Sequence, residues 1–201
     1  MSDAKPLPDF EAPPVIEVVC GIQFAPIEGL TLGHLGRWWS QISGEFPECR
    51  EVAPILPVIE RFEPEEPRGL QSIEPFPMPR LWLINKLGDQ LIQLQKDRFL
   101  FNWRKTSEEH VYPRYAFVRS SFDSNLSQFS AFLKQTTNQS LRAVQYELTY
   151  INHIAEGEQS WRRPAEIGSL LPDISWRDVR ERFLPEPEGL DFRASFILPE
   201  R

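Results

Sequence analysis

Residues 15–24, VIEVVCGIQF, decide the fold that we predict for this chain. Every second position is apolar, which is the period of a β-strand with one apolar face. The residues on that face are Ile16, Val18, Cys20, Ile22 and Phe24. Such a strand needs a covering layer on one side only, so the sequence that follows must supply that layer.

Two later segments have apolar residues at helical spacing and can form the layer. Thr31 can cap the first helix, and Pro47 stops it. Pro113 begins the second helix, which has about 20 residues. The stripe of the first helix contains Leu32, Leu35, Trp38, Trp39, Ile42 and Phe46. We predict that the Trp38-Trp39 pair belongs to the core with one ring partly covered; the alternative is an anchor for a partner.

Residues 81–105 predict a β-hairpin with Gly88-Asp89 in its turn. Along the return arm, residues 90–104, the apolar positions change from even to odd numbers after Leu94. Because a slip of one residue turns every side chain to the other face, an irregularity must absorb one residue. We expect a β-bulge, and the alternative is a tight turn at Lys96-Asp97.

Residues 141–154 alternate again, which predicts a further strand of the sheet. We expect four of its apolar residues to face the core: Val144, Tyr146, Leu148 and Tyr150. The order strand, helix, hairpin, helix, strand predicts an α+β fold, an antiparallel sheet with two amphipathic helices on one face. A ferredoxin-like split is the simplest form, and a helix-grip-like sheet with longer strands is the alternative.

Proline punctuates the rest of the chain and indicates its organisation. We predict an extended arm over residues 1–13 and a single α+β domain over 14–201. Within that domain we predict a proline-rich crossing segment over 47–79, which contains a short strand at 55–61. We also predict a C-terminal extension over 155–201, which contains a short helix at 163–171 and a last strand near 190–198.

The composition narrows the class of protein. The chain has 201 residues, 41% hydrophobic and 25% charged, which is typical of a globular protein. No apolar run approaches the roughly 18 residues that a membrane span needs, and no secretory signal is visible. Two cysteines cannot form a disulfide scaffold, so we expect a cytoplasmic protein. The net charge of −7 does not favour a nucleic-acid binder.

Several segments together resemble a sporadically distributed prokaryotic family of uncharacterised function. The resemblance covers roughly residues 7–200 and rests on PPVIEVVCGIQF (13–24), RLWL (80–83), LIQLQKDRF (91–99), NWRK (102–105), YPRY (112–115) and ELTYINHI (147–154). It implies no activity, cofactor or catalytic set. It implies longer members, and hence a sheet edge left open in this chain. The distribution suggests an accessory role in a mobile or defence-type locus.

No catalytic motif is present: the sequence lacks a phosphate-binding loop, a G-x-S-x-G elbow and zinc-ligand spacing. The main candidate site is the polar face of the sheet, which can bind a polar ligand or serve as a solvated surface. Its residues are Glu17, Gln23, Gln145, Glu147 and Thr149.

Two further clusters carry candidate residues. The strand 98–105 interleaves cations with aromatic rings, and Arg98, Asn102, Trp103 and Arg104 are candidates for stacking and anion contact. The alternative is a core strand with solvated cations. At the end of the strand predicted at 141–154 lie Glu147, Tyr150, Asn152 and His153. Glu147 can orient His153 as a base, or His153 is a hydrogen-bonded surface residue.

Our leading hypothesis is a non-enzymatic binding protein that uses the polar sheet face or an open strand edge. We predict another protein or self-association as its partner, and no membrane, cofactor or metal. One alternative is a small-substrate enzyme in which Glu17, Glu147 and His153 provide acid–base groups. The other is a single-stranded nucleic-acid binder that uses residues 98–105.

Overall fold

A computed structural model describes residues 10–56, 77–157, 161–174 and 188–196 of the chain. The chain divides into two units, Met1–Asn152 and His153–Arg201. The first unit contains the sheet and both α-helices, and the described residues of the second contain one short 3₁₀ helix. The predicted arm lies mostly outside the described residues, and its described part, residues 10–13, has no regular structure.

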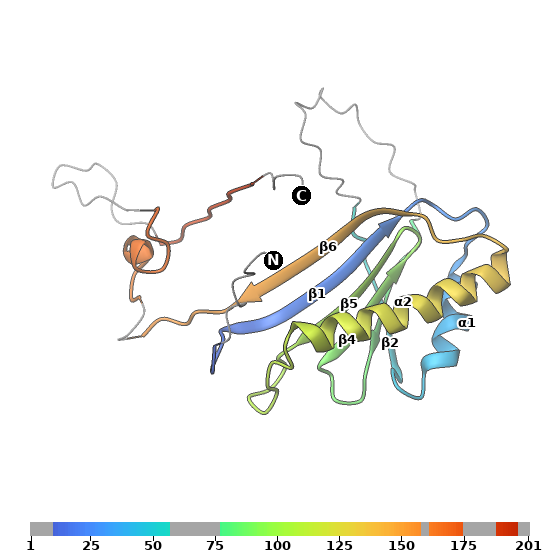
Figure 1. The fold of residues 1–201 in the computed structure, drawn as a ribbon, viewed down its shortest axis with the longest axis horizontal. Coiled ribbons are helices and arrows are strands. Elements are labelled where there is room, and N and C mark those ends of the chain that lie inside the picture. Colours follow the sequence, from blue (N-terminus) through green and yellow to red (C-terminus); the bar gives the residue numbers. More distant parts are fainter. Residues whose placement is uncertain (1–9, 57–76, 158–160, 175–187, 197–201) are drawn as a thin grey trace, which may run out of the picture. The chain divides into compact units, whose positions relative to one another are not determined.

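The first unit is an α+β fold, as predicted, with one six-stranded sheet in which every neighbouring pair is antiparallel. The strand order is β2-β3-β4-β5-β1-β6, with β6 at one edge (Figure 1). The elements in chain order are β1 (Val15–Phe24), α1 (Leu32–Ile42), β2 (Glu48–Val52), β3 (Arg80–Ile84), β4 (Gln90–Gln95), β5 (Arg98–Arg104), α2 (Tyr115–Thr137) and β6 (Ala143–Asn152).

Four consecutive strands lie between the two helices, where we predicted one hairpin and a short strand at 55–61. The change of parity comes from a tight turn at Lys96-Asp97, which separates β4 from β5, and the expected β-bulge is wrong. A turn reverses the chain and so resets which face each residue occupies. The additional strand β2 lies inside the predicted crossing segment. Of the strand predicted at 55–61, residues 55–56 are not in a strand and 57–61 lie outside the described residues.

Both helices cover the same face of the sheet, because both pack on Phe99 of β5. The ring centroid of Phe99 lies 5.9 Å from that of Trp38 in α1 and 5.5 Å from that of Phe129 in α2. The predicted role of the tryptophan pair is confirmed: Trp38 is buried, whereas Trp39 is half-buried and its Nε1 donates to the Phe46 carbonyl at 2.9 Å. Aromatic contacts between these elements therefore hold α1 and α2 on β1 and β5.

The second unit has little regular structure among its described residues. The helix predicted at 163–171 is a short 3₁₀ helix, η1 (Pro164–Ser169), and the Trp161 indole donates to the Ile154 carbonyl at 2.8 Å. The strand predicted near 190–198 is wrong for residues 190–196, and 197–198 lie outside the described residues. Alternation is a property of one segment, but a strand needs a second segment for its backbone hydrogen bonds.

Candidate functional site

Polar side chains form rows across the sheet face that points away from the helices. The strand register aligns Gln95 of β4, Arg98 of β5, Gln23 of β1 and Gln145 of β6 in one such row. In an antiparallel sheet, residues that are directly opposite share a face. The predicted polar face is therefore present, and it extends over β4 and β5, from which the sequence analysis drew fewer residues.

A chain of hydrogen bonds connects this face from β3 to β1. The Arg80 guanidinium donates to Gln93 Oε1 at 2.7 Å, and Gln93 Nε2 donates to Asn102 Oδ1 at 3.0 Å. Asn102 Nδ2 in turn donates to Glu17 Oε1 at 2.5 Å, and the Trp82 indole adds a second donor to Gln93 Oε1 at 3.2 Å. The chain links a cation to a carboxylate through two buried amides, and Arg80 Nε is the one buried polar atom of these five side chains that has no hydrogen-bond partner.

Arg98 and Glu147 form a second polar contact nearer the β6 edge. Arg98 is only 5% exposed, and its Nε lies 3.8 Å from Glu147 Oε1, which is an ion-pair distance and too long for a hydrogen bond. Gly21 makes room for this contact. A Cβ at Gly21 would lie 2.4 Å from Leu100 Cδ2 and 2.6 Å from Glu147 Cγ. The absence of a side chain at Gly21 is thus what lets Glu147 lie across β1.

The acid–base candidates Glu17 and Glu147 do not lie side by side. Glu17 and Glu147 share the polar face, but Glu17 is opposite Ile151, whereas Glu147 is opposite Gly21, four residues further along β1. His153 begins the second unit. Within the described ranges, no group of three or more metal-ligating side chains could hold an ion, and no helix is long and apolar enough to cross a membrane.

The remaining candidates divide between the polar face and other places. Trp103 is 2% exposed and lies in the core, where its ring is 5.4 Å from that of Tyr112, so it is not placed to stack on a ligand. Arg104 donates to the Gly88 carbonyl at 3.1 Å and lies over the Trp82 ring. Gln23, Arg98 and Asn102 are buried on the polar face, and Tyr150 and Asn152 are exposed near the end of β6.

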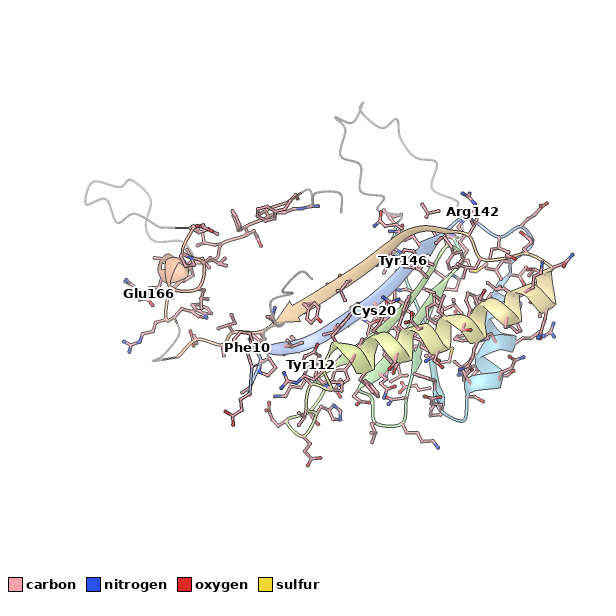
Figure 2. All side chains as sticks on the ribbon, viewed as in Figure 1. Phe10, Cys20, Tyr112, Arg142, Tyr146 and Glu166 are labelled. Atoms are coloured by element: carbon pink, nitrogen blue, oxygen red, sulfur yellow. The ribbon has the colours of Figure 1, made fainter. Side chains whose placement is uncertain are left out.

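The expectation that the apolar residues of β6 face a covered core is wrong. Tyr146 is 69% exposed and Leu148 is 51% exposed, and Val144 and Tyr150 are exposed too. Three of them, Tyr146, Leu148 and Tyr150, lie on the helix-side face, since they are opposite Ile22, Cys20 and Val18. The helix α2, however, packs on β1 and β5, so the layer of helices ends one strand short of the edge. Figure 2 shows Tyr146 on this edge strand, with Cys20 on β1 beside α2.

Two hollows lie between α2 and β6, and Tyr146 lines both. The smaller has a volume of about 150 Å³ and is lined by Cys20, Gly21, Tyr115, Arg119, Phe122, Tyr146, Glu147 and Leu148. The larger has a volume of about 580 Å³ and extends toward Lys134 and Leu141. Burial raises the pKa of the Cys20 thiol, which keeps it in its neutral form. The two hollows are lined by both polar and apolar side chains, and together they form a groove that is open along β6.

The backbone of β6 also presents groups to the open side. Phe24 N–H donates to the Asp97 carbonyl at 2.9 Å, so the even-numbered residues of β1 direct their backbone groups to β5 and the odd-numbered ones to β6. Gly21 is opposite Glu147, so the backbone groups of Glu147 point to β1. Those of its even-numbered neighbours therefore point away from the sheet. These outward residues are Tyr146, Leu148 and Tyr150, and no described strand pairs with them.

Searches among known protein families, curated proteins and solved structures find no match for this chain. The family resemblance stays a prediction, and the candidate site rests on geometry alone.

Sequence reasoning found the polar face and missed the exposed ridge of β6, which we define as Tyr146, Leu148 and Tyr150. One signal was available. Over Ala143–Asn152 the only charged residue is Glu147, and two of the ridge residues are tyrosines, a type enriched at interfaces. The alternation alone could not reveal that the helices stop before this strand.

Proposed function

We propose that this chain is a non-enzymatic binding protein that holds an extended partner segment on the open edge of β6. The observation that carries this proposal is that β6 directs the backbone groups of Tyr146, Leu148 and Tyr150 away from β1, beside the apolar side chains of the same residues. An added strand would gain main-chain hydrogen bonds and apolar contacts together.

The edge lacks the devices that usually block strand addition. Protected edges carry lysines, prolines or inward-pointing charges. Residues 143–152 contain no proline and no lysine, and Glu147, their one charged residue, points to the polar face beside Arg98. The pairing of β6 with β1 is regular over residues 145–151 and has a register shift near each end, so the unprotected part of the edge that is consistent with a binding role is residues 145–151.

The enzyme alternative has less support. Glu17 accepts a hydrogen bond from Asn102, and Glu147 lies beside Arg98, so both carboxylates have structural partners. A general base must lie within hydrogen-bond reach of a substrate proton in a shared pocket. Glu147 lines the smaller of the two hollows beside α2, and Glu17 lines neither of them.

The nucleic-acid alternative has less support too. Phe99, Phe101 and Trp103 are buried on the helix side of β5, so their rings cannot stack on bases while the fold is intact. The cations of that strand lie on the opposite face, and the chain carries a net charge of −7.

Selection from a displayed library of random peptides tests the proposal. We expect enriched peptides to have apolar residues at alternate positions and to bind the wild-type chain. The variant Leu148→Pro removes one outward N–H and leaves the ladder with β1 intact, so binding should fall at least about tenfold. The control Leu148→Val keeps both the N–H and an apolar side chain and should bind normally. Equal binding to the wild type and to the proline variant would contradict the proposal.

A further inference from the structure

We propose that the partner on the β6 edge is a second copy of this chain, paired antiparallel about a two-fold axis that passes through Leu148. The inference rests on the proposed function and names its partner. It follows from which backbone groups are free, which side chains share a face, and how charge is distributed along the strand.

A two-fold axis perpendicular to the sheet makes β6 of one copy pair with β6 of the other. It also keeps the helix-side faces of the two sheets on the same side. In such an isologous pair, when residue i is opposite residue j, residue j is also opposite residue i. Because the even-numbered residues carry the outward backbone groups, even-numbered residues must pair with even-numbered residues. The ridges of the two copies then lie on the same face of one continuous sheet.

Charge and length select one register among those allowed. An axis through Glu147 places two carboxylates directly opposite each other, which is unfavourable. An axis through Tyr146 pairs only residues 143–149 of each strand with each other. An axis through Leu148 pairs residues 144–152 with their copies, of which 145–151 are in regular register with β1, and places Glu147 opposite Thr149. This register has the longest overlap that brings no like charges together.

The apolar side chains agree with this register. With the axis at Leu148, that residue meets its own copy, and Tyr146 meets Tyr150 of the second copy on both sides of the axis. Cross-strand pairs of aromatic and aliphatic side chains stabilise antiparallel sheets. All three ridge residues are exposed in the single chain, so pairing removes apolar surface from water at six positions of the dimer.

The low charge of β6 matters because the whole chain is acidic. Two copies with a net charge of −7 each repel one another unless the contact surface is nearly neutral. Over residues 143–152 the single charge, Glu147, lies 3.8 Å from the Arg98 guanidinium, which offsets it. The β6 edge is therefore a place where two acidic copies can meet at little electrostatic cost.

A charge exchange at Leu148 tests the axis directly. We expect the full chain to be a dimer by light scattering and sedimentation. Leu148→Asp and Leu148→Lys each place two like charges on the axis, so each variant alone should dissociate at least about tenfold more readily. An equimolar mixture should form a heterodimer, visible as the one-to-one mass in native mass spectrometry. Leu87→Asp, which changes an exposed leucine in the β3–β4 turn, should leave the dimer intact.

A second variant tests the register without weakening the strand. Thr149→Lys places a cation opposite Glu147 of the second copy at two symmetric positions, so the dimer should dissociate at least severalfold less readily, and high salt should cancel the gain. Far-UV circular dichroism of every variant checks that the fold is retained.

Three outcomes overturn the inference: a wild-type chain that stays monomeric, a dimer that tolerates both charges at Leu148, or charged variants that fail to pair when mixed. The proposed function is judged separately. A monomer that binds selected peptides in a manner sensitive to Leu148→Pro keeps the proposed function and removes the second copy. A monomer that binds none removes both.

Discussion

The strands β1 and β6 have ten residues each, are hydrogen-bonded to one another and have the same alternation of apolar side chains. Ile22 of β1 is 1% exposed, and Tyr146, directly opposite it on β6, is 69% exposed. The two differ in their surroundings: β1 has a strand on each side and α2 above it, whereas β6 has one neighbour and lies beyond the helix. The same local pattern thus makes a core strand in one place and an exposed ridge in the next.

The largest expected difference in stability is between alanine substitutions of the two opposed residues, Ile22 and Tyr146. Ile22→Ala leaves a cavity under α2 and should lower the free energy of unfolding by about 2–5 kcal/mol. Tyr146→Ala changes an exposed side chain and should cost less than about 1 kcal/mol. Urea unfolding of both variants, at concentrations where the chain is monomeric, measures the difference. Similar losses would mean that β6 is covered in solution.

The second prediction concerns the polar face. Asn102→Ala removes an amide that serves both the buried Gln93 and the half-buried Glu17, so two polar groups lose a partner, which should cost about 1–3 kcal/mol. Thr149 of β6 lies in the same cross-strand row as Asn102, but it is exposed. Thr149→Ala should therefore change the free energy of unfolding by less than about 0.5 kcal/mol. Denaturant unfolding compares the two, and a neutral Asn102→Ala would show that the network is not structural.

The third prediction tests the close approach of Glu147 to β1. Gly21→Ala introduces a Cβ between Leu100 and Glu147, and the resulting displacement should cost about 1–2 kcal/mol. Gly36→Ala, in the middle of α1 with open space around it, should instead stabilise the chain by about 0.5–1 kcal/mol. Thermal and urea unfolding give both values, and equal effects would contradict the packing at Gly21.

The smallest expected effect is on how the free energy of unfolding depends on pH, through the contact of Tyr112 with Tyr150 near the end of β6. Burial raises the pKa of Tyr112, and a hydrogen bond from its hydroxyl to that of Tyr150 adds to the shift. The folded state therefore holds this proton more tightly than the unfolded chain does. The stabilising contribution of the protonated Tyr112 hydroxyl is complete at a pH below the ordinary tyrosine pKa of about 10, and it is lost as the pH rises above that value.

Tyr112→Phe should remove that part of the alkaline decline. The measurement is the free energy of unfolding at pH about 8 and about 10.5, in the wild type and in the variant. A decline of the same size in both would show that Tyr112 does not contribute to the alkaline dependence.

Much of the fold could be predicted from the sequence because its signals are local. The alternation of β1, the stripe with Trp38 and the helix after Pro113 each express a backbone period, and the structure confirms all three. The polar side of β1 was predicted for the same reason, because residues such as Glu17 and Gln23 face away from Ile22 whatever their neighbours are. The change of parity at 95–98 was detected, although its cause was misjudged.

Only the tertiary structure decided where the helices end relative to the strands. No local rule states that α2 packs over β1 and β5 and leaves Tyr146, Leu148 and Tyr150 in water. The same holds for the chain of amides through Gln93 and Asn102, which joins residues of different strands only after their register is set. The sequence by itself determined which residues share a face. Whether helices cover a face, and which strands contact one another, depends on segments far apart in the chain. Packing therefore decided which face is the core, which face carries the polar network and which edge is open.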